Sequence, residues 1–108
     1  MTSDNERLHH MLAAIREIEE VAYQGREAFL QSRILQNAAL YSFIVIGEAA
    51  NGISNAFRQQ WPEVAWRRAV RYRNFVIHAY ASVGAGQLWD TIENDIPLLK
   101  QQLTGILA

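Results

Sequence analysis

The sequence is 108 residues long, half of them hydrophobic and 19% charged, with six glycines, two prolines and a formal net charge of −1. Such a chain can bury one core but not two, and its composition excludes both disorder and a turn-rich all-β fold, which leaves one helical domain over residues 1–108. Because cysteine is absent, disulfide frameworks, thiol catalysis and most structural zinc sites are excluded.

The first predicted helix begins near the N-terminus, where Ser3 and Asp4 can cap it, and ends before Gly25. Its apolar residues step by three and four and share one face: Leu8, Met11, Leu12, Ile15, Ile18 and Ala22. His9 and His10 lie among polar neighbours without a metal-ligand pattern, which predicts surface residues. The polar N-terminus and the lack of an apolar run of about 20 residues predict a cytoplasmic protein without a membrane partner.

The second predicted helix runs from about Ser32 to Gln60 and is stopped by Pro62. Its centre, residues 38–50, is apolar nearly all round, which indicates a helix buried in the bundle or shared between the bundle and a partner subunit. Glu48 interrupts this stretch. An acid there should be paired with an arginine, across the bundle or across a dimer, and it could orient a catalytic arginine.

The third predicted helix runs from about Trp66 to Tyr80, and the fourth from about Gln87 to Leu107, with a kink at Pro97. Four helices with short links favour an all-α, antiparallel four-helix-type bundle. The three tryptophans fall at helix boundaries or on an apolar stripe, which predicts packing groups rather than platforms for stacked RNA bases: Trp61, Trp66 and Trp89.

On a helical wheel the third helix has two unlike sides. One side steps by three and four and is expected to face the core: Ala69, Tyr72, Val76 and Ala79. The other side carries Val70, Arg73, Asn74, Ile77 and Tyr80, with Arg67, Arg71 and His78 along its edge. An apolar strip that points away from the core, flanked by Arg, Asn and His, predicts a protein interface with functional groups at its rim.

The spacing of the polar residues predicts a two-fold dimer. Arg73 and His78 are about 140° apart around one helix, whereas Asn74 and His78 lie on neighbouring turns. One helix therefore brings Arg73 and His78 together poorly. Pairing of this helix with its copy would place two Arg, two Asn and two His in one cleft.

These side chains suit metal-independent cleavage of RNA, in which the 2′-OH attacks the adjacent phosphate and leaves a cyclic phosphate. His78 can exchange protons near neutral pH, Arg73 can stabilise the charge of the transition state, and Asn74 can orient the imidazole or a phosphate oxygen. No cofactor is needed, and DNA is spared because it lacks the 2′-OH. His78 alone is typical of an ordinary histidine at a helix end, but its register with Arg73 and Asn74 favours catalysis.

Basic residues cluster ahead of this segment. Between Arg58 and Arg73 five arginines face a single acid, Glu63. Arg67 and Arg71 are candidates for holding the RNA backbone, since a guanidinium matches phosphate geometry. The alternative is that the run is only a solvated face of the helix.

The segment RNFVIHAY, residues 73–80, resembles the R-polar-x(3)-H-x-Y signature of HepT-like members of the HEPN superfamily. Three further stretches are similar to the family: IGEAA at residues 46–50, WPEVAWR at residues 61–67 and DIP at residues 95–97. The resemblance covers essentially the whole chain, in order.

The resemblance implies a four-helix-type fold, dimerisation with the active site at the interface, and an endoribonuclease toxin aimed at tRNA or mRNA in a type II/VII-like toxin-antitoxin pair. It gives the catalytic role to Arg73 and His78 and a supporting role to Asn74. Tyr80 matches the tyrosine that the cognate MNT-type nucleotidyltransferase antitoxin modifies with AMP, which adds bulk and negative charge beside the arginines. The implied partners are RNA, a second copy and the antitoxin, in a dimer or a larger hetero-oligomer.

A second interpretation remains open, namely a non-catalytic dimeric adaptor or binding module, because a fold does not guarantee an activity. The residues favour the nuclease, since Arg73, Asn74 and His78 have no structural need to occur together.

Overall fold

The computed structural model describes residues 2–75 and 84–107. Within these ranges the chain forms helices and contains no strand, which confirms the all-α prediction. The elements are α1 (Asp4–Tyr23), α2 (Arg26–Gln31), α3 (Arg33–Gly52), α4 (Asn55–Gln60), α5 (Trp66–Arg71), the 3₁₀ turn η1 (Tyr72–Asn74), α7 (Ala85–Asn94) and α8 (Ile96–Leu107). The predictions for Val76, Ile77, His78, Ala79 and Tyr80 concern residues outside the described ranges and stay predictions.

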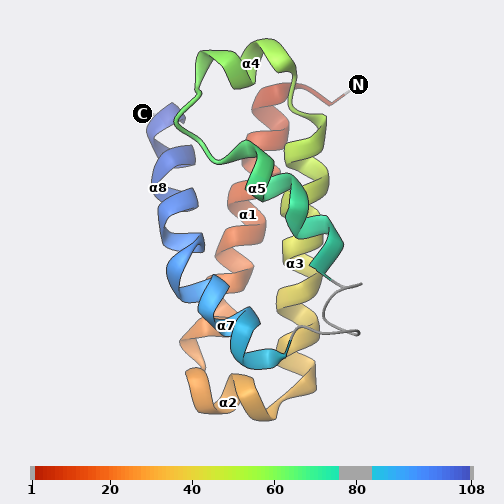
Figure 1. Ribbon diagram of the computed structural model, residues 1–108, viewed down its shortest axis with the longest axis vertical. Coiled ribbons are helices and arrows are strands. Elements are labelled where there is room, and N and C mark those ends of the chain that lie inside the picture. Colours follow the sequence, from red (N-terminus) through yellow and green to blue (C-terminus); the bar gives the residue numbers. More distant parts are fainter. Residues whose placement is uncertain (1, 76–83, 108) are drawn as a thin grey trace.

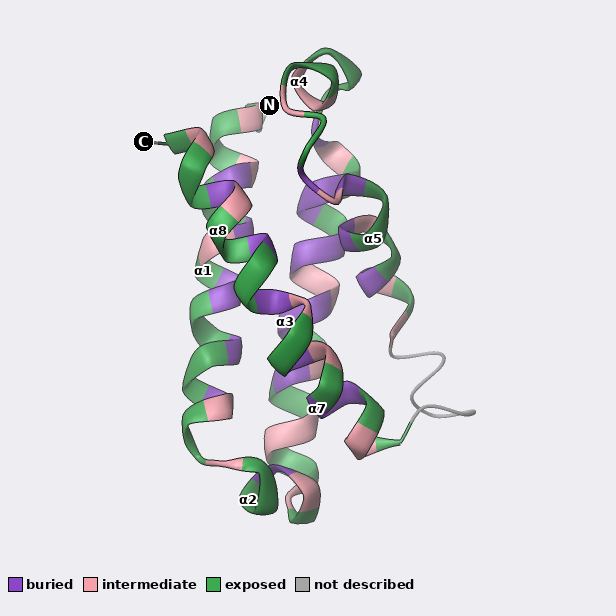
Figure 2. Ribbon diagram, turned by 60° about the vertical axis from the view of Figure 1, so that its left-hand side comes forward, coloured by how far each residue is buried: buried purple, intermediate pink, exposed green. Residues whose placement is uncertain are grey.

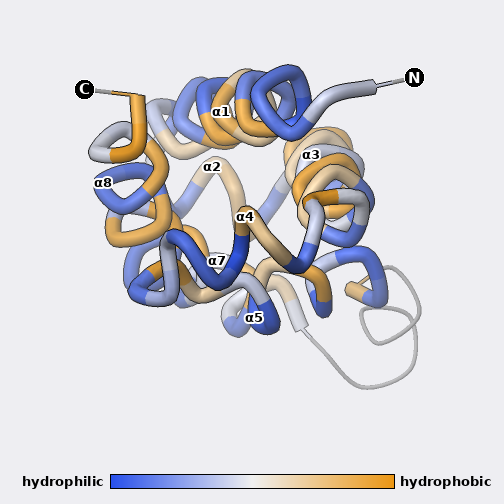
Figure 3. Tube along the Cα trace, turned by 90° about the horizontal axis from the view of Figure 1, so that it is seen from above, coloured by the Kyte–Doolittle hydropathy of each residue, from blue (hydrophilic) through white to orange (hydrophobic). Residues whose placement is uncertain are grey.

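α1 and α3 form an antiparallel pair along the long axis of the molecule, which measures 41 × 27 × 24 Å (Figure 1). α8 runs beside α1, and α5 lies on α3 with η1 at its end. Seen from above, α1, α3, α5 and α8 occupy four corners around a common interior (Figure 3). This is the predicted antiparallel four-helix-type arrangement, with α2 and α4 at opposite ends and α7 leading into α8.

The core is made by the inner sides of these helices (Figure 2). Its fully buried large side chains are Leu8, Met11, Ile15 and Ile18 on α1, Phe29 on α2, Phe43 and Ile46 on α3, and Leu103 on α8. The predicted stripe of the first helix is confirmed, with Leu12 and Ala22 half-buried at its edges. Trp66 and Trp89 are buried and Trp61 is half-buried, which confirms that the tryptophans are packing groups.

The single helix predicted over residues 32–60 is wrong, because the chain leaves the helix after Gly52 and starts a new one at Asn55. Ser54 caps α4: its Oγ accepts a hydrogen bond from the Phe57 N–H at 3.2 Å. The hydroxyl and the backbone N–H of Ser54 also donate to the Asp4 carboxylate, at 2.7 and 2.9 Å, and these bonds lower the pKa of Asp4. The cap and the long-range bonds together outweigh continuation of the helix.

Two polar side chains complete the helix ends nearby. Ser3 rather than the following aspartate caps α1, with its Oγ accepting a hydrogen bond from the Glu6 N–H at 3.1 Å. Arg58 closes the C-terminal end of α3, where its Nη2 donates to the carbonyl oxygens of Ala50 and Asn51 at 2.7 and 3.4 Å. The first arginine of the basic run therefore serves the fold.

The loop before α5 is fixed to α8 by one glutamine. Gln102 Oε1 accepts a hydrogen bond from the Ala65 N–H at 3.3 Å, and Gln102 Nε2 donates to the Glu63 carbonyl oxygen at 2.9 Å. At the same place Trp66 Nε1 donates to the Trp61 carbonyl oxygen at 2.9 Å. These bonds set where α5 starts, and hence where the residues after it lie.

The last predicted helix is interrupted as expected. α7 ends at Asn94 and α8 begins at Ile96, so that Pro97 lies in the first turn of α8, where its missing N–H has no helical partner to lose. Within residues 2–75 and 84–107, no helix combines the length and the apolar character needed to cross a bilayer.

Candidate active site

The segment with the candidate catalytic residues departs from a regular helix. α5 ends at Arg71 and continues as η1, which contains Arg73 and the exposed Asn74. A 3₁₀ turn advances about 120° per residue, against about 100° in an α-helix, so the wheel of a continuous helix does not hold beyond Arg71. Because His78 and Tyr80 lie outside the described residues, their placement relative to Arg73 stays a prediction.

The faces of α5 agree with the predicted ones only in part. Ala69 and Tyr72 are buried, which confirms them on the core side. Val70, predicted on an outward apolar strip, is instead half-buried and packs against the hydrophobic core. α5 packs on α3, and the side of α5 that carries Val70 is therefore not free.

Arg73 meets Glu48 of α3. The Arg73 Nη1 atom lies 3.9 Å from Glu48 Oε1, and the two side chains are 37% and 64% exposed. The predicted pairing of Glu48 with an arginine is confirmed, although Glu48 lies on the solvent side of α3. A half-exposed ion pair contributes only about 0–1 kcal/mol, so another anion can take the place of the carboxylate.

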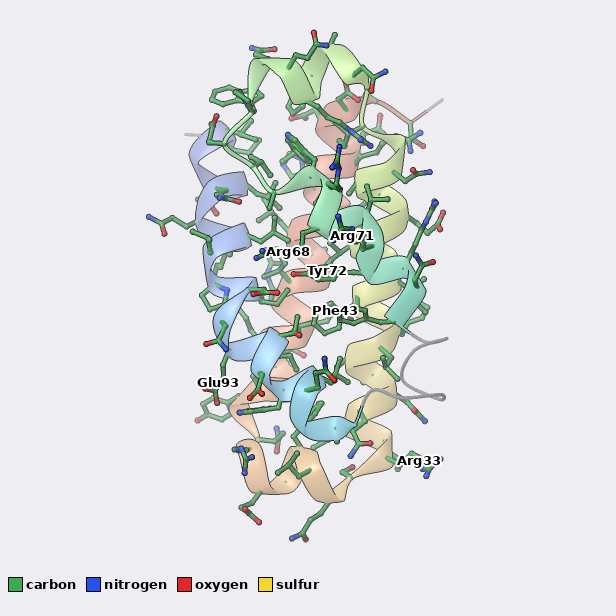
Figure 4. The ribbon with its side chains drawn as sticks, viewed as in Figure 1. Arg33, Phe43, Arg68, Arg71, Tyr72 and Glu93 are labelled. Atoms are coloured by element: carbon green, nitrogen blue, oxygen red, sulfur yellow. The ribbon has the colours of Figure 1, made fainter. Side chains whose placement is uncertain are left out.

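An aromatic cluster of three rings, Phe43, Tyr72 and Phe75, anchors the turn from the inside. The ring centroid of Phe43, on α3, lies 4.9 Å from the ring centroid of Tyr72 and 5.0 Å from that of Phe75. The rings of Tyr72 and Phe75 are also 5.0 Å apart. Phe43 and Tyr72 are buried between the helices (Figure 4), so the residues before and after Arg73 and Asn74 are both tied to the core.

Tyr72 is anchored a second time, through its hydroxyl group. The hydroxyl donates to Asp95 Oδ2 at 3.4 Å, and Arg68 Nη1 lies 3.6 Å from Asp95 Oδ1. Burial, and then the neighbouring Asp95 carboxylate, raise the pKa of Tyr72, which keeps the phenol protonated and able to donate. Sequence reasoning has Asp95 only as part of the DIP stretch; its contact with η1 depends on the fold.

The arginines of α5 have different surroundings. Arg68 is directed toward the α7–α8 joint, where it meets Asp95 (Figure 4). Arg67 and Arg71 are exposed on α5. Arg67 and Arg71 are four residues apart and therefore lie on one side of the helix. Arg73, two residues after Arg71, lies on a different side and is half-exposed, so solvent reaches all three guanidinium groups.

α3 carries an apolar stripe that is open to solvent and leads to the site. Ile34 and Tyr41 are 81% and 66% exposed, and they are seven residues apart, as are Tyr41 and Glu48. Ala38 and Val45 lie on the same side, between them. We call Ile34, Ala38, Tyr41 and Val45 the α3 stripe. α3 is thus buried on one side, and on its other side Ile34, Ala38 and Tyr41 are exposed in the subunit, while Val45 is half-buried against the core.

Within the described residues, no group of three histidines or carboxylates is arranged to hold a metal ion. His9 and His10 are exposed on α1, which confirms the prediction, and His9 Nδ1 lies 2.8 Å from the Asn5 carbonyl oxygen. The described part of the site offers the Arg73 guanidinium, the amide of Asn74 and the carboxylate of Glu48 for chemistry.

The chain matches the family model described as "Ribonuclease HepT-like" over residues 11–106. It is 38% identical over 99 residues to the "Probable ribonuclease HepT" of Thermococcus cleftensis, which covers 91% of this chain and 90% of that protein. A "Putative RNase" of Caldanaerobacter subterraneus is 33% identical over 90 residues, covering 83% and 80%. A "Gamma-glutamylcyclotransferase and putative RNase" of Methanocaldococcus jannaschii is 32% identical over 101 residues, which are 93% of this chain but 46% of that longer protein. No solved structure gives a significant match.

Proposed function

Because the chain belongs to the HepT-like ribonuclease family, we propose that it is a metal-independent endoribonuclease that cleaves RNA with Arg73 and His78. The observation that supports this most is the setting of Arg73. Its turn is tied to the core on both sides, yet its guanidinium is half-exposed and paired only weakly with Glu48. A cation that is fixed at its backbone and open at its tip suits a site that must meet a phosphate.

In the proposed reaction the His78 imidazole removes the proton from the 2′-OH of the substrate, and O2′ bonds to the adjacent phosphorus. The bond from phosphorus to O5′ of the next nucleotide breaks, and O5′ takes a proton from the imidazolium of a second His78. The products are a 2′,3′-cyclic phosphate and a 5′-hydroxyl. Arg73 binds the phosphate oxygens as negative charge builds, and Asn74 orients the imidazole.

Three further residues are proposed to support the substrate, which is tRNA or mRNA. Arg67 and Arg71, exposed on one side of α5, hold backbone phosphates. Glu48 orients the Arg73 side chain until the phosphate replaces it.

The proposed active unit is a two-fold dimer, because acid and base come from two copies of His78. The α3 stripe supports a second copy as its occupant, since the stripe ends one turn from Glu48, the residue that contacts Arg73. A copy seated on the stripe therefore reaches the candidate site. The contact is apolar along the stripe and polar at Glu48, as in an interface with a functional rim.

The end groups of the cleaved RNA test the reaction. Purified protein incubated in EDTA with unfractionated tRNA, or with a single-stranded RNA of mixed sequence, is expected to release fragments with 2′,3′-cyclic phosphate and 5′-hydroxyl ends, identified by mass spectrometry. A DNA strand of the same sequence should stay intact because it lacks the attacking hydroxyl. Cleavage that requires a metal ion would contradict the mechanism, and an RNA that is bound but never cut would favour the adaptor interpretation.

The proposed setting is a toxin-antitoxin pair in which an MNT-type nucleotidyltransferase silences the nuclease. The phenol oxygen of Tyr80 attacks the α-phosphorus of ATP, pyrophosphate leaves, and the bound AMP brings negative charge next to the arginines. After co-expression with such a partner, mass spectrometry is expected to show one AMP on Tyr80 and none on a Tyr80→Phe chain. Full neutralisation with Tyr80 unmodified would instead point to sequestration.

A further inference from the structure

The backbone of α3 approaches the turn that carries Arg73 unusually closely, because residue 47 has no side chain. A Cβ atom built on Gly47 would lie 2.4 Å from the Arg73 backbone N, 2.7 Å from its Cβ and 2.9 Å from its Cα. Real Cβ atoms essentially never come within 3.0 Å of another heavy atom in this way. The obstructing atoms belong to the backbone and the first side-chain atom of Arg73, so a rotamer change cannot relieve the contact.

The turn cannot move sideways without cost, because its neighbours are already held. One helical turn before Gly47, Phe43 packs on Tyr72 and Phe75. Tyr72 is also hydrogen-bonded to Asp95. Added volume at residue 47 therefore pushes η1 away from α3, and Arg73 moves with it.

From this contact we infer that Gly47 is a positioning residue for the active-site arginine. Because Gly47 has no side chain, the Arg73 backbone can pack directly against α3. This contact fixes the position of the Arg73 Cα atom, from which the side chain extends to the RNA phosphate. The inference rests on the proposed ribonuclease function, and it gives a task to the glycine of the IGEAA stretch. Glycine weakens the interior of a helix, so its place in the middle of α3 is explained by the neighbour and not by the helix.

The test replaces glycine by alanine at two places in α3. Gly47→Ala is expected to lower kcat about 100-fold with KM little changed, because a displacement of about 1 Å at a catalytic group costs that much. Gly52→Ala is the matched control: its Cβ would meet the far end of the Arg7 side chain, which can move away, so kcat should stay at the wild-type value. Gly105→Ala is added to every chain in the comparison, including the parent, to stabilise α8. A Cβ atom at residue 105 meets no neighbour, and alanine is a better helix former than glycine.

A double variant separates positioning from a general loss of structure. In a chain that already carries Arg73→Ala, Gly47→Ala should lower the remaining rate far less than 100-fold, because most of its effect passes through the lost guanidinium and only the shift of Asn74 remains. Loss of the same factor in both backgrounds would overturn the inference.

The remaining outcomes distinguish the inference from the function on which it rests. If the parent chain cleaves RNA in a manner that depends on Arg73, and Gly47→Ala keeps the full kcat, the inference is wrong and the function stands. If the parent cleaves neither tRNA nor single-stranded RNA, the proposed function is wrong, and ¹H–¹⁵N spectra test the contact by itself. The amide resonance of Arg73 should then shift with Gly47→Ala but not with Gly52→Ala. Equal shifts in the two variants would overturn the inference. A Gly47→Ala chain that does not fold in the stabilised background overturns it as well.

Discussion

Replacement of Arg73 by alanine is expected to lower kcat/KM for RNA cleavage by about 10³-fold, because the transition state loses the cation that meets its added negative charge. His78→Ala is expected to cost about 10²- to 10⁴-fold through the loss of general acid–base catalysis. The rates are measured from the release of labelled fragments at limiting and at saturating RNA. Arg73→Lys should recover only part of the loss, since a lysine carries the charge without the bidentate geometry.

The control for net charge is Arg16→Ala, which removes an exposed arginine from α1 and should leave the rate unchanged. Circular dichroism verifies that each variant is folded. Wild-type and His78→Ala chains refolded together should give mixed dimers that have lost most of the activity, because only one His78 remains where the reaction needs two. An undiminished rate in Arg73→Ala would remove this residue from the mechanism, and mixed dimers that keep half of the wild-type rate would speak against a composite site.

A charge placed in the α3 stripe is expected to separate the dimer and, with it, the active site. Tyr41→Glu puts a carboxylate among apolar side chains that the second copy would cover, and burial of an unpaired charge costs several kcal/mol. The dissociation constant of the dimer should rise at least about 100-fold, which corresponds to about 3 kcal/mol. Light scattering measures the mass, and the cleavage rate should fall with the dimer fraction as the protein is diluted.

Tyr23→Glu makes the same substitution at a tyrosine that is 89% exposed on α1, and it should change neither mass nor rate. Because Tyr41 is itself exposed in the subunit, its replacement should leave the helical content intact. A Tyr41→Glu protein that remains dimeric and fully active would exclude the α3 stripe as the interface. A wild-type chain that is monomeric and active would exclude the composite site altogether.

The success of sequence reasoning for this fold depends on how far apart the interacting residues are in the chain. The cap at Ser3, whose Oγ accepts from the Glu6 N–H at 3.1 Å, and the helix break before Pro97 depend on neighbours within one turn, and both are predicted. The break after Gly52 is missed because the partner of Ser54 is Asp4, fifty residues earlier. The helix propensities of the residues around Ser54 do not indicate that contact.

At the candidate site, too, local features can be predicted from the sequence and long-range contacts cannot. Arg73, Asn74 and the need of Glu48 for an arginine can be found from residue types and spacing, and the pair of Arg73 with Glu48 is present. The 3₁₀ turn η1 and the close contact of the Arg73 backbone with Gly47 cannot be found in this way, since both arise where α5 and η1 pack on α3. A glycine in the middle of an apolar helix is the one local signal that a close backbone neighbour leaves in a sequence.

The pairing of α1 with α3 also bears on the order in which the molecule is built during translation. All but one of its largest fully buried side chains lie within residues 8–46, so most of the central packing is available to the first half of the chain. Domains emerge from the ribosome N-terminus first, and helical hairpins with local contacts form quickly. We therefore expect α1 and α3 to pair before the segment that carries Arg73 is added to them.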